Sequence, residues 1–516
     1  MEESFKVIER EKNEFNEDKI DRKINLFIFV ILLYNKFNIN NLEVIMEKLV
    51  LDVHESPKKL SSLILFSMQH ILAVLVATIT VPLLVPGMPI AATMVSAGIG
   101  TLFYLWVTNG KSPVFLSSSF AYISPMCSAV AIGLIGDAVG FNYLALILGM
   151  AMVGAIYVTV ALLIKKFGSS WLNKILPPVV AGPVIMVIGL SLAGSAINNL
   201  TNVNGGAANY NLIHILCGFF ALFTTAFSAH YGRKNMLGLI PFVIGMVSGY
   251  VLAVLFTLFG SIIGGNDYFA VVNFAPVIDN FKNFSFNSIF NYRMFVPNAE
   301  ESFIILRWEE ISKFDWAQIG QVILLFVPVS FVTICEHIGD HKNLSNIIGK
   351  DLLFDEPGIS KTLIGDGVAT TISGMLCGAA NTTYGESVAV VGTTKVASVK
   401  VLKLAAILMV FFGLFTPFTT LLQTIPACVT GGISIVLYGF IASSGVKMLI
   451  NDKVDLNDTK NLFIAATILV LGIGGLSLKF GNPLSPVIQI TSTAVAMIVG
   501  IILNFVLKSP KEENQE

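Results

Sequence analysis

Two interrupted apolar stretches, VFLSSSFAYISPMC at residues 114–127 and NTTYGESVAVVGTT at residues 381–394, decide how this chain folds. Each is apolar enough to lie in a membrane, but serine, threonine, glycine or proline breaks it, so neither predicts one continuous spanning helix. Backbone N–H groups in such segments can turn toward a ligand instead of bonding along a helix. Interrupted segments at matching positions of two halves indicate a binding site near the membrane midplane. Two re-entrant loops of purely structural use are the alternative.

The composition around these stretches is that of a membrane protein. Of 516 residues 54% are hydrophobic and only 13% are charged, whereas soluble domains contain roughly 25% charged residues. The formal net charge of -1 provides no large field of one sign. Nucleic acid and other polyanions are therefore excluded as expected partners, and the lipid bilayer is the expected surrounding.

Counting the apolar runs predicts the number of crossings. A spanning helix needs about 20 mostly apolar residues. Runs of that length begin near twelve positions: Leu60, Pro89, Asn142, Pro178, Asn211, Leu237, Ala317, Leu363, Val401, Ala427, Leu462 and Pro486. Together with the two interrupted stretches they make fourteen crossings, and stretches 114–127 and 381–394 become segments 3 and 10.

The positions of lysine and arginine agree with fourteen crossings, because short cytoplasmic loops carry the excess of positive charge. The connection 198–209 contains no lysine or arginine, which is typical of a short outside loop. The expected inside loops contain Lys58, Lys59, Lys111, Lys165, Lys166, Lys174, Arg233, Lys234, Lys342, Lys350, Lys361, Lys395, Lys400, Lys447, Lys453, Lys460, Lys508 and Lys511. The pattern predicts a multi-pass protein of the cytoplasmic membrane with both termini inside.

The two halves of the chain resemble each other weakly. Three short patterns recur in order at a nearly constant offset: Gln69-His70 with Glu336-His337, Ser119 to Ala121 with Thr383 to Gly385, and the pair Pro177 and Gly182 with Pro426 and Gly431. With seven crossings in each half, the second half must enter the membrane from the opposite side. The sequence therefore predicts a 7+7 inverted repeat.

Carboxylates within the spans are the first candidates for function, because ionisable groups are expensive in a membrane. Glu336 and Asp340 are four residues apart and share one helix face. Two acids so close in a poorly hydrated place are not expected to be ionised together, which favours proton uptake by one of them. Glu386 follows Tyr384-Gly385 in segment 10 and is expected to face the same site. A helix-end cap remains the alternative for Asp340.

Other polar residues are less decisive. Asp366, within Gly-Asp-Gly, fits a site residue or a helix-entry feature equally well, and His70 fits a buried packing residue better than a proton relay. The five cysteines lack close C-x-x-C spacing and are read as small buried hydrophobes. No span carries HExxH, GxSxG or a paired Asp-rich motif, so an enzyme, a metal site and a cofactor are not expected.

Six ordered strings now make a family resemblance specific. They are SMQHILAVLVATITVP, SSSFAYISP, VTICEHIGDH, GDGVATTISG, NTTYGES and LYGFIASSG, spread over residues 67–445. They resemble the uracil permease branch of the nucleobase/ascorbate transporter family, and the likeness covers nearly everything after Met46.

The resemblance implies an all-α polytopic membrane protein with fourteen segments, a core domain, a gate domain, and short antiparallel strands in segments 3 and 10. The core domain would comprise residues 60–164 and 317–423, the gate domain 176–258 and 427–507, with an extracellular loop at 260–316. The charged residues 1–59 would be a cytoplasmic extension, of which 1–45 is suspected not to be native, and residues 508–516 a cytoplasmic tail. A monomer and a homodimer both remain open.

The resemblance also implies uracil import by proton symport through alternating access, with a xanthine-type purine or sodium-coupled symporter as the alternative. The implied uracil contacts, matched by motif, are Ala77, Phe120 through its backbone, Glu336, Gly385, Glu386 and Tyr438. Glu336 and Asp340 are the implied proton-coupling pair. The implied pyrimidine preference rests on Glu386, since purine-selective members resemble one another in having Gln there.

Three departures from the family pattern bear on this site. Asp340 stands where a bacterial uracil permease has His, so a proton-relay role is not carried over in detail. Ser387 and Ala389 stand where the family signature has Asn and Gly, which leaves the affinity open.

Overall fold

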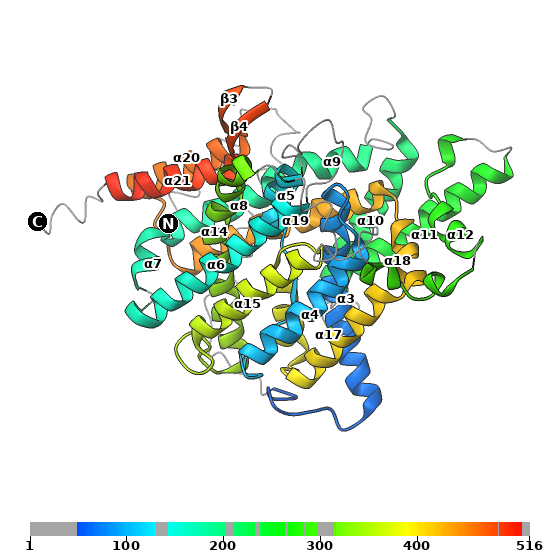
Figure 1. Cartoon of the computed structure of the whole chain (residues 1–516), viewed down its shortest axis with the longest axis horizontal. Coiled ribbons are helices and arrows are strands. Elements are labelled where there is room, and N and C mark those ends of the chain that lie inside the picture. Colours follow the sequence, from blue (N-terminus) through cyan, green and yellow to red (C-terminus); the bar gives the residue numbers. More distant parts are fainter. Residues whose placement is uncertain are drawn as a thin grey trace, which may run out of the picture. The chain divides into compact units, whose positions relative to one another are not determined.

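The computed structural model describes most of the chain that follows the N-terminal extension (Figure 1). The described residues are 49–130, 143–168, 170–201, 210–232, 238, 240–263, 267–282, 284–296, 314, 316–482 and 485–507, all in the unit Leu49–Glu516. The predictions made for residues 1–45, for the tail 508–516 and for parts of the loop 260–316 lie outside them.

Helices dominate the described chain, as its long apolar runs predict. In chain order they are α3 Leu60–Leu84, α4 Ile90–Val107, α5 Ile123–Val130, α6 Tyr143–Phe167, α7 Ser170–Ile175, α8 Pro178–Ser191, α9 Ala193–Thr201, α10 Leu212–Tyr231, α11 Pro241–Ile262, α12 Ala275–Lys282, α14 Ile319–Ile348, α15 Gly358–Met375, α16 Gly385–Thr394, α17 Val399–Leu414, α18 Thr416–Gln423, α19 Ala427–Asn451, α20 Thr459–Ile473 and α21 Ser492–Val506. Side chains of Asn211, Asp458 and Thr491 cap three helix starts.

Eight of the described helical segments are long and apolar enough to cross a membrane. They are Leu60–Leu84, Ile90–Val107, Tyr143–Phe167, Pro178–Thr201, Leu212–Tyr231, Pro241–Ile262, Ile319–Ile348 and Ala427–Asn451. Three shorter apolar helices, Phe120–Val130, Thr459–Ile473 and Ser492–Val506, accompany them. The chain is thus an all-α polytopic membrane protein, and its described part adds two small sheets. Its count of fourteen crossings and its inverted repeat stay predictions.

Among the described residues, two antiparallel strand pairs interrupt the helices. β1 (Leu116–Ser118) pairs with β2 (Asn381–Thr383), so the predicted strands in segments 3 and 10 are present. β3 (Leu478–Asn482) pairs with β4 (Ser485–Ile490) in a hairpin that the sequence analysis missed. The sequence analysis expected a spanning helix to begin near Pro486. That start is wrong, because residues 485–490 form β4 and α21 begins only at Ser492. Proline lacks an N–H for a helix ladder, and Val487, Ile488 and Ile490 are β-branched and favour extended backbone.

The helices pack in two groups. In the first, which we call the α6/α15 group, α15 packs against α6 and α4, and α17 packs against α4 and α3. In the second, the α8/α19 group, α19 packs against α8, α9 and α10, while α11 covers α10 and α20 covers α8 and α21. Glycine allows backbone contact in both groups. A Cβ on Gly154 would lie 2.7 Å from the carbonyl oxygen of Gly367, and one on Gly182 would lie 3.0 Å from that of Gly445.

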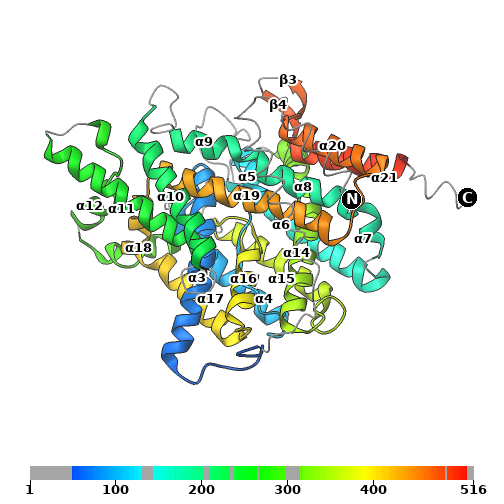
Figure 2. The ribbon, with the colours of Figure 1, turned by 180° about the vertical axis from the view of Figure 1, so that it is seen from behind.

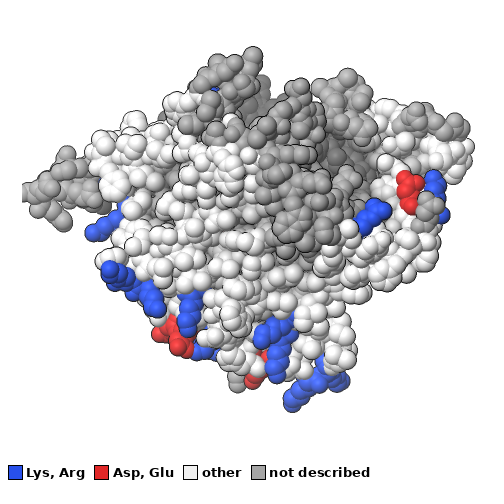
Figure 3. Space-filling model, viewed as in Figure 1, with Lys and Arg blue, Asp and Glu red and all other residues white. Residues whose placement is uncertain are grey.

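Charge is distributed unevenly over the surface. In the view of Figure 1, lysine and arginine gather along the lower edge, below α4, α15 and α17, while most of the described surface above that edge is uncharged (Figure 3). An uncharged belt bordered by lysines is what a membrane-embedded protein requires. We call this edge the Lys-rich side.

Candidate functional site

The pair of strands β1 and β2 lies at the centre of the site. Leu116 faces Thr383 and Ser118 faces Asn381 in antiparallel register, and all six residues of the two strands are buried. After β1 the chain enters the 3-10 turn Phe120–Tyr122 and then α5, and after β2 it enters α16. The site is therefore built where two helices begin, and their first backbone N–H groups are available to a ligand.

Side chains from surrounding helices hold the strands in place. The hydroxyl of Thr101 accepts from the N–H of Leu116 at 3.0 Å, and that of Thr370 donates to the carbonyl of Asn381 at 2.7 Å. Thr78 on α3 and Ser117 on β1 share a hydrogen bond of 2.8 Å. Ser387 accepts from the N–H of Phe115 at 3.1 Å, so this buried departure from the family pattern joins α16 to the residue before β1.

The three predicted carboxylates converge on the start of α16. Glu336 and Asp340 are half-buried on one face of α14, and Glu386 is half-buried in the first turn of α16. Asp340 Oδ2 accepts from the hydroxyl of Thr383 at 2.8 Å, and its Oδ1 would lie 3.7 Å from a Cβ on Gly385. Glu336 lies within electrostatic range of both other carboxylates. Since α14 continues to Ile348, Asp340 does not cap its end.

The remaining predicted contacts come from both helix groups. Phe120 is buried, and its ring meets that of Tyr438 on α19 edge-on, with centroids 5.8 Å apart. Ala77 is buried on α3 beside Thr78, whose hydrogen bond to Ser117 places this turn next to β1. Gly385, by contrast, is exposed. Phe120 and Tyr438 thus join the α8/α19 group to the strand pair.

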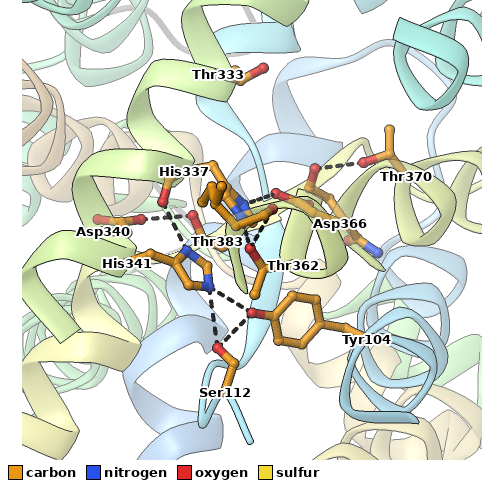
Figure 4. Close-up of polar contacts among 12 residues, drawn as sticks. Tyr104, Ser112, Thr333, His337, Asp340, His341, Thr362, Asp366, Thr370 and Thr383 are labelled. Atoms are coloured by element: carbon orange, nitrogen blue, oxygen red, sulfur yellow. Dashed lines mark hydrogen bonds and ion pairs between the residues drawn. The ribbon is translucent and has the colours of Figure 1, made fainter. Parts of the chain in front are cut away.

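Behind the carboxylates lies a buried polar network that the sequence analysis missed (Figure 4). His337 Nδ1 donates to Asp366 Oδ2 at 2.7 Å, and its Nε2 lies 3.0 Å from the hydroxyl of Thr362. All three side chains are fully buried. Asp366 lies in the middle of α15, so it is not a helix-entry feature.

A second histidine extends the network toward α4. His341 Nδ1 donates to the carbonyl of His337 at 2.9 Å, which leaves Nε2 to accept from the hydroxyl of Tyr104 at 2.7 Å. Ser112 completes this cluster at 2.7 Å from the Tyr104 hydroxyl (Figure 4). His337 and His341 repeat the four-residue spacing of Glu336 and Asp340 on the neighbouring face, and that spacing was the available signal for them.

Comparisons with known proteins agree with this architecture. The sequence profile described as the Permease family matches residues 61–481. A uracil permease of Bacillus caldolyticus is 39% identical over 463 residues, covering 90% of this chain and 95% of the relative. One of Bacillus subtilis is 38% identical, covering 91% and 98%, and one of Escherichia coli K12 is 32% identical, covering 90% and 95%.

Solved structures show the same fold at low identity. The transmembrane domain of the cyanobacterial bicarbonate transporter BicA has a TM-score of 0.56 at 15% identity, covering 88% of this chain and 99% of that one. The murine anion transporter Slc26a9 in the inward-facing state has a TM-score of 0.57 at 10% identity, covering 92% and 74%.

The spanning helices and the half-helix site define a multi-pass membrane transport protein rather than an enzyme. The chain belongs to the Permease family, whose profile covers most of its length.

Proposed function

We propose that this permease imports uracil together with a proton across the cytoplasmic membrane by alternating access. The observation that carries the proposal is the convergence of three carboxylates on the open start of α16, beside the β1–β2 pair. Relatives covering 90% of the chain are named uracil permeases. An anion exchanger of the same fold would instead need neutral or basic groups at this place.

The chemistry of uracil complements these groups. Uracil offers two N–H donors and two carbonyl acceptors, whereas an ionised carboxylate only accepts and a backbone N–H only donates. Glu336 and Glu386 therefore accept from the ligand, and the amides of Phe120 and Gly385 donate to it. Ala77 and the rings of Phe120 and Tyr438 form apolar walls. Asp340 has one oxygen bound to Thr383 and the other directed toward Gly385, next to the ligand.

Alternating access requires two bodies that move past the site. We assign residues 60–164 and 317–423 to a core domain and 176–258 and 427–507 to a gate domain. The α6/α15 and α8/α19 packing groups support this division. We assign proton coupling to Glu336 and Asp340. We place both termini on the cytoplasmic side, together with the Lys-rich loops. Monomer and homodimer are both compatible with this scheme.

Uptake of labelled uracil into cells that lack their own uracil permease tests the function directly. We expect accumulation above the outside concentration that collapses with a protonophore, because the proton gradient drives the import. If accumulation persists with a protonophore but requires sodium, the coupling ion is sodium and not the proton. No accumulation from an expressed, membrane-inserted protein would contradict the proposal.

Competition with unlabelled bases tests the substrate and the role of Glu386. Cytosine has a lone pair where uracil has its second ring N–H, so it would oppose a carboxylate and leave a buried group unpaired. We expect 5-fluorouracil to compete well and cytosine and xanthine to compete poorly. Glu386→Gln is the matched variant, because an amide can donate as well as accept, and it should weaken the discrimination. Competition by cytosine or xanthine equal to that of uracil in the unmodified protein would refute both assignments.

A further inference from the structure

In its second half, from about Cys335 onward, α14 presents three faces, and each faces a different part of the protein. Glu336 and Asp340 face the site, while His337 and His341 face the buried network with α15 and α4. A third face, with Cys335, Gly339 and Lys342, faces the α8/α19 group. The histidine face is tied to α15 and α4 by short hydrogen bonds, and Asp340 is bound to Thr383 of β2, which packs against α15. This part of α14 therefore belongs with the α6/α15 group.

The third face is packed loosely. A cavity of about 330 Å³ separates it from α7, α8 and α19, with Leu176, Ala181 and Met448 among its lining residues. A Cβ on Gly339 would meet only the flexible end of Met448, at 3.8 Å. Within the α8/α19 group, by comparison, a Cβ on Gly182 would lie 2.9 Å from Leu449. The joint between the groups at Gly339 therefore has free volume that the contact of Gly182 with Leu449 lacks.

One ion pair bridges this loose joint. Lys342 Nζ on α14 lies 3.0 Å from Oδ1 of Asp452, the residue that follows the end of α19, and both residues line the cavity. The two side chains are 58% and 32% exposed, so solvent screens their attraction and the pair can open at small energetic expense.

One face of α16, the helix that starts beside the carboxylates, is exposed. Gly385, Ala389 and Thr393 follow one another at four-residue spacing along α16 and are exposed, although α16 starts beside buried strands. On the opposite side of α16, Val388 and Val391 are buried. Figure 2 shows α16 beside α3, against which it packs. This exposed stripe leads from Asp340 toward Lys395, the residue that follows the end of α16. In this conformation the closed ion pair is therefore present together with an exposed stripe that starts beside Asp340.

We propose that Lys342 and Asp452 form an ionic latch that holds the two helix groups together while the site faces the Lys-rich side. The latch breaks when the groups slide, and the cavity beneath it supplies the space for that movement. The latch rests on the alternating-access part of the proposed function and is independent of which base is carried.

Accessibility of the exposed stripe tests the latch. Ala389→Cys is introduced into the full chain with its five native cysteines replaced, and labelling by a maleimide is followed in inside-out vesicles. An exposed ion pair contributes at most about fivefold to an equilibrium. We expect Lys342→Ala and Asp452→Ala each to slow labelling roughly two- to fivefold, as the population shifts to the other side. The exchange Lys342→Asp with Asp452→Lys should restore the original rate.

A matched control exists within the α6/α15 group. Lys350 Nζ lies 2.9 Å from Asp52, and these side chains are 48% and 46% exposed. The hydrogen bond from Lys350 holds the pKa of Asp52 below its usual value, so this carboxylate is ionised at neutral pH. Residues 50–53 bond to residues 395–399, so the pair joins parts of the same group. Lys350→Ala should leave the labelling rate unchanged.

The outcomes separate the latch from the proposed function. If uracil changes the labelling rate but Lys342→Ala does not, the latch is refuted and alternating access stands. Failure of the charge exchange to restore the rate also refutes the latch. If neither uracil nor any variant changes labelling, alternating access fails together with the latch.

Discussion

Replacing Glu336 by Gln is expected to abolish accumulation of uracil against a gradient. Glutamine keeps the size of the side chain but cannot take up and release a proton. Glu336 lies one helical turn from Asp340 and within electrostatic range of Glu386, so a change in its protonation acts directly on the other carboxylates of the site. Uncoupled exchange of uracil across the membrane can persist in this variant, because the strands and the start of α16 remain intact.

The measurement compares net accumulation with exchange of labelled uracil in the same vesicles. Glu356→Gln is the control, because this exposed glutamate pairs with Lys111 outside the site and its loss should leave accumulation unchanged. If Glu336→Gln keeps full, protonophore-sensitive accumulation, the proton-coupling role belongs to Asp340 or Glu386 instead.

Replacing Asp366 by Ala is expected to destabilise the protein strongly. His337 donates to this carboxylate at 2.7 Å, and both side chains are completely buried. Removing one partner leaves a buried donor unpaired and opens a small cavity, which together cost about 3 kcal/mol of the free energy of unfolding. Because the pair links α14 to α15, its loss also removes one of the contacts that hold the helix carrying Glu336 and Asp340.

Thermal unfolding in detergent, followed by the loss of the monodisperse peak, measures this effect. Asp366→Asn is the matched variant, since its amide oxygen can still accept from His337, and it should lower the unfolding temperature less. Thr362→Val removes the weaker contact to His337 and should cost roughly 1 kcal/mol. An unfolding temperature for Asp366→Ala equal to that of the unmodified chain would show that the pair does not hold α14 in place.

The hairpin β3–β4 shows that the length of an apolar run does not by itself predict where a helix begins. A long uncharged run around Pro486 predicts a spanning helix when only hydrophobicity is counted, because the same residues are apolar in either conformation. Prolines at positions 483 and 486 and the β-branched residues after them were the local signal for extended backbone. Pairing with Leu478–Asn482 then satisfies the strand hydrogen bonds, so the helix begins later, at Ser492.

The sequence by itself determined the membrane character, the long helices, the two interrupted segments and the shared face of Glu336 and Asp340. Each of these depends on composition or on spacing within one segment. Spacing is sufficient there because residues four apart in a helix lie on the same face. Only the tertiary structure decided that Asp366 meets His337, that Thr383 meets Asp340, and that Lys342 meets Asp452 across a cavity. These contacts join distant segments, and the packing of whole helices against one another, which no local pattern encodes, sets their partners.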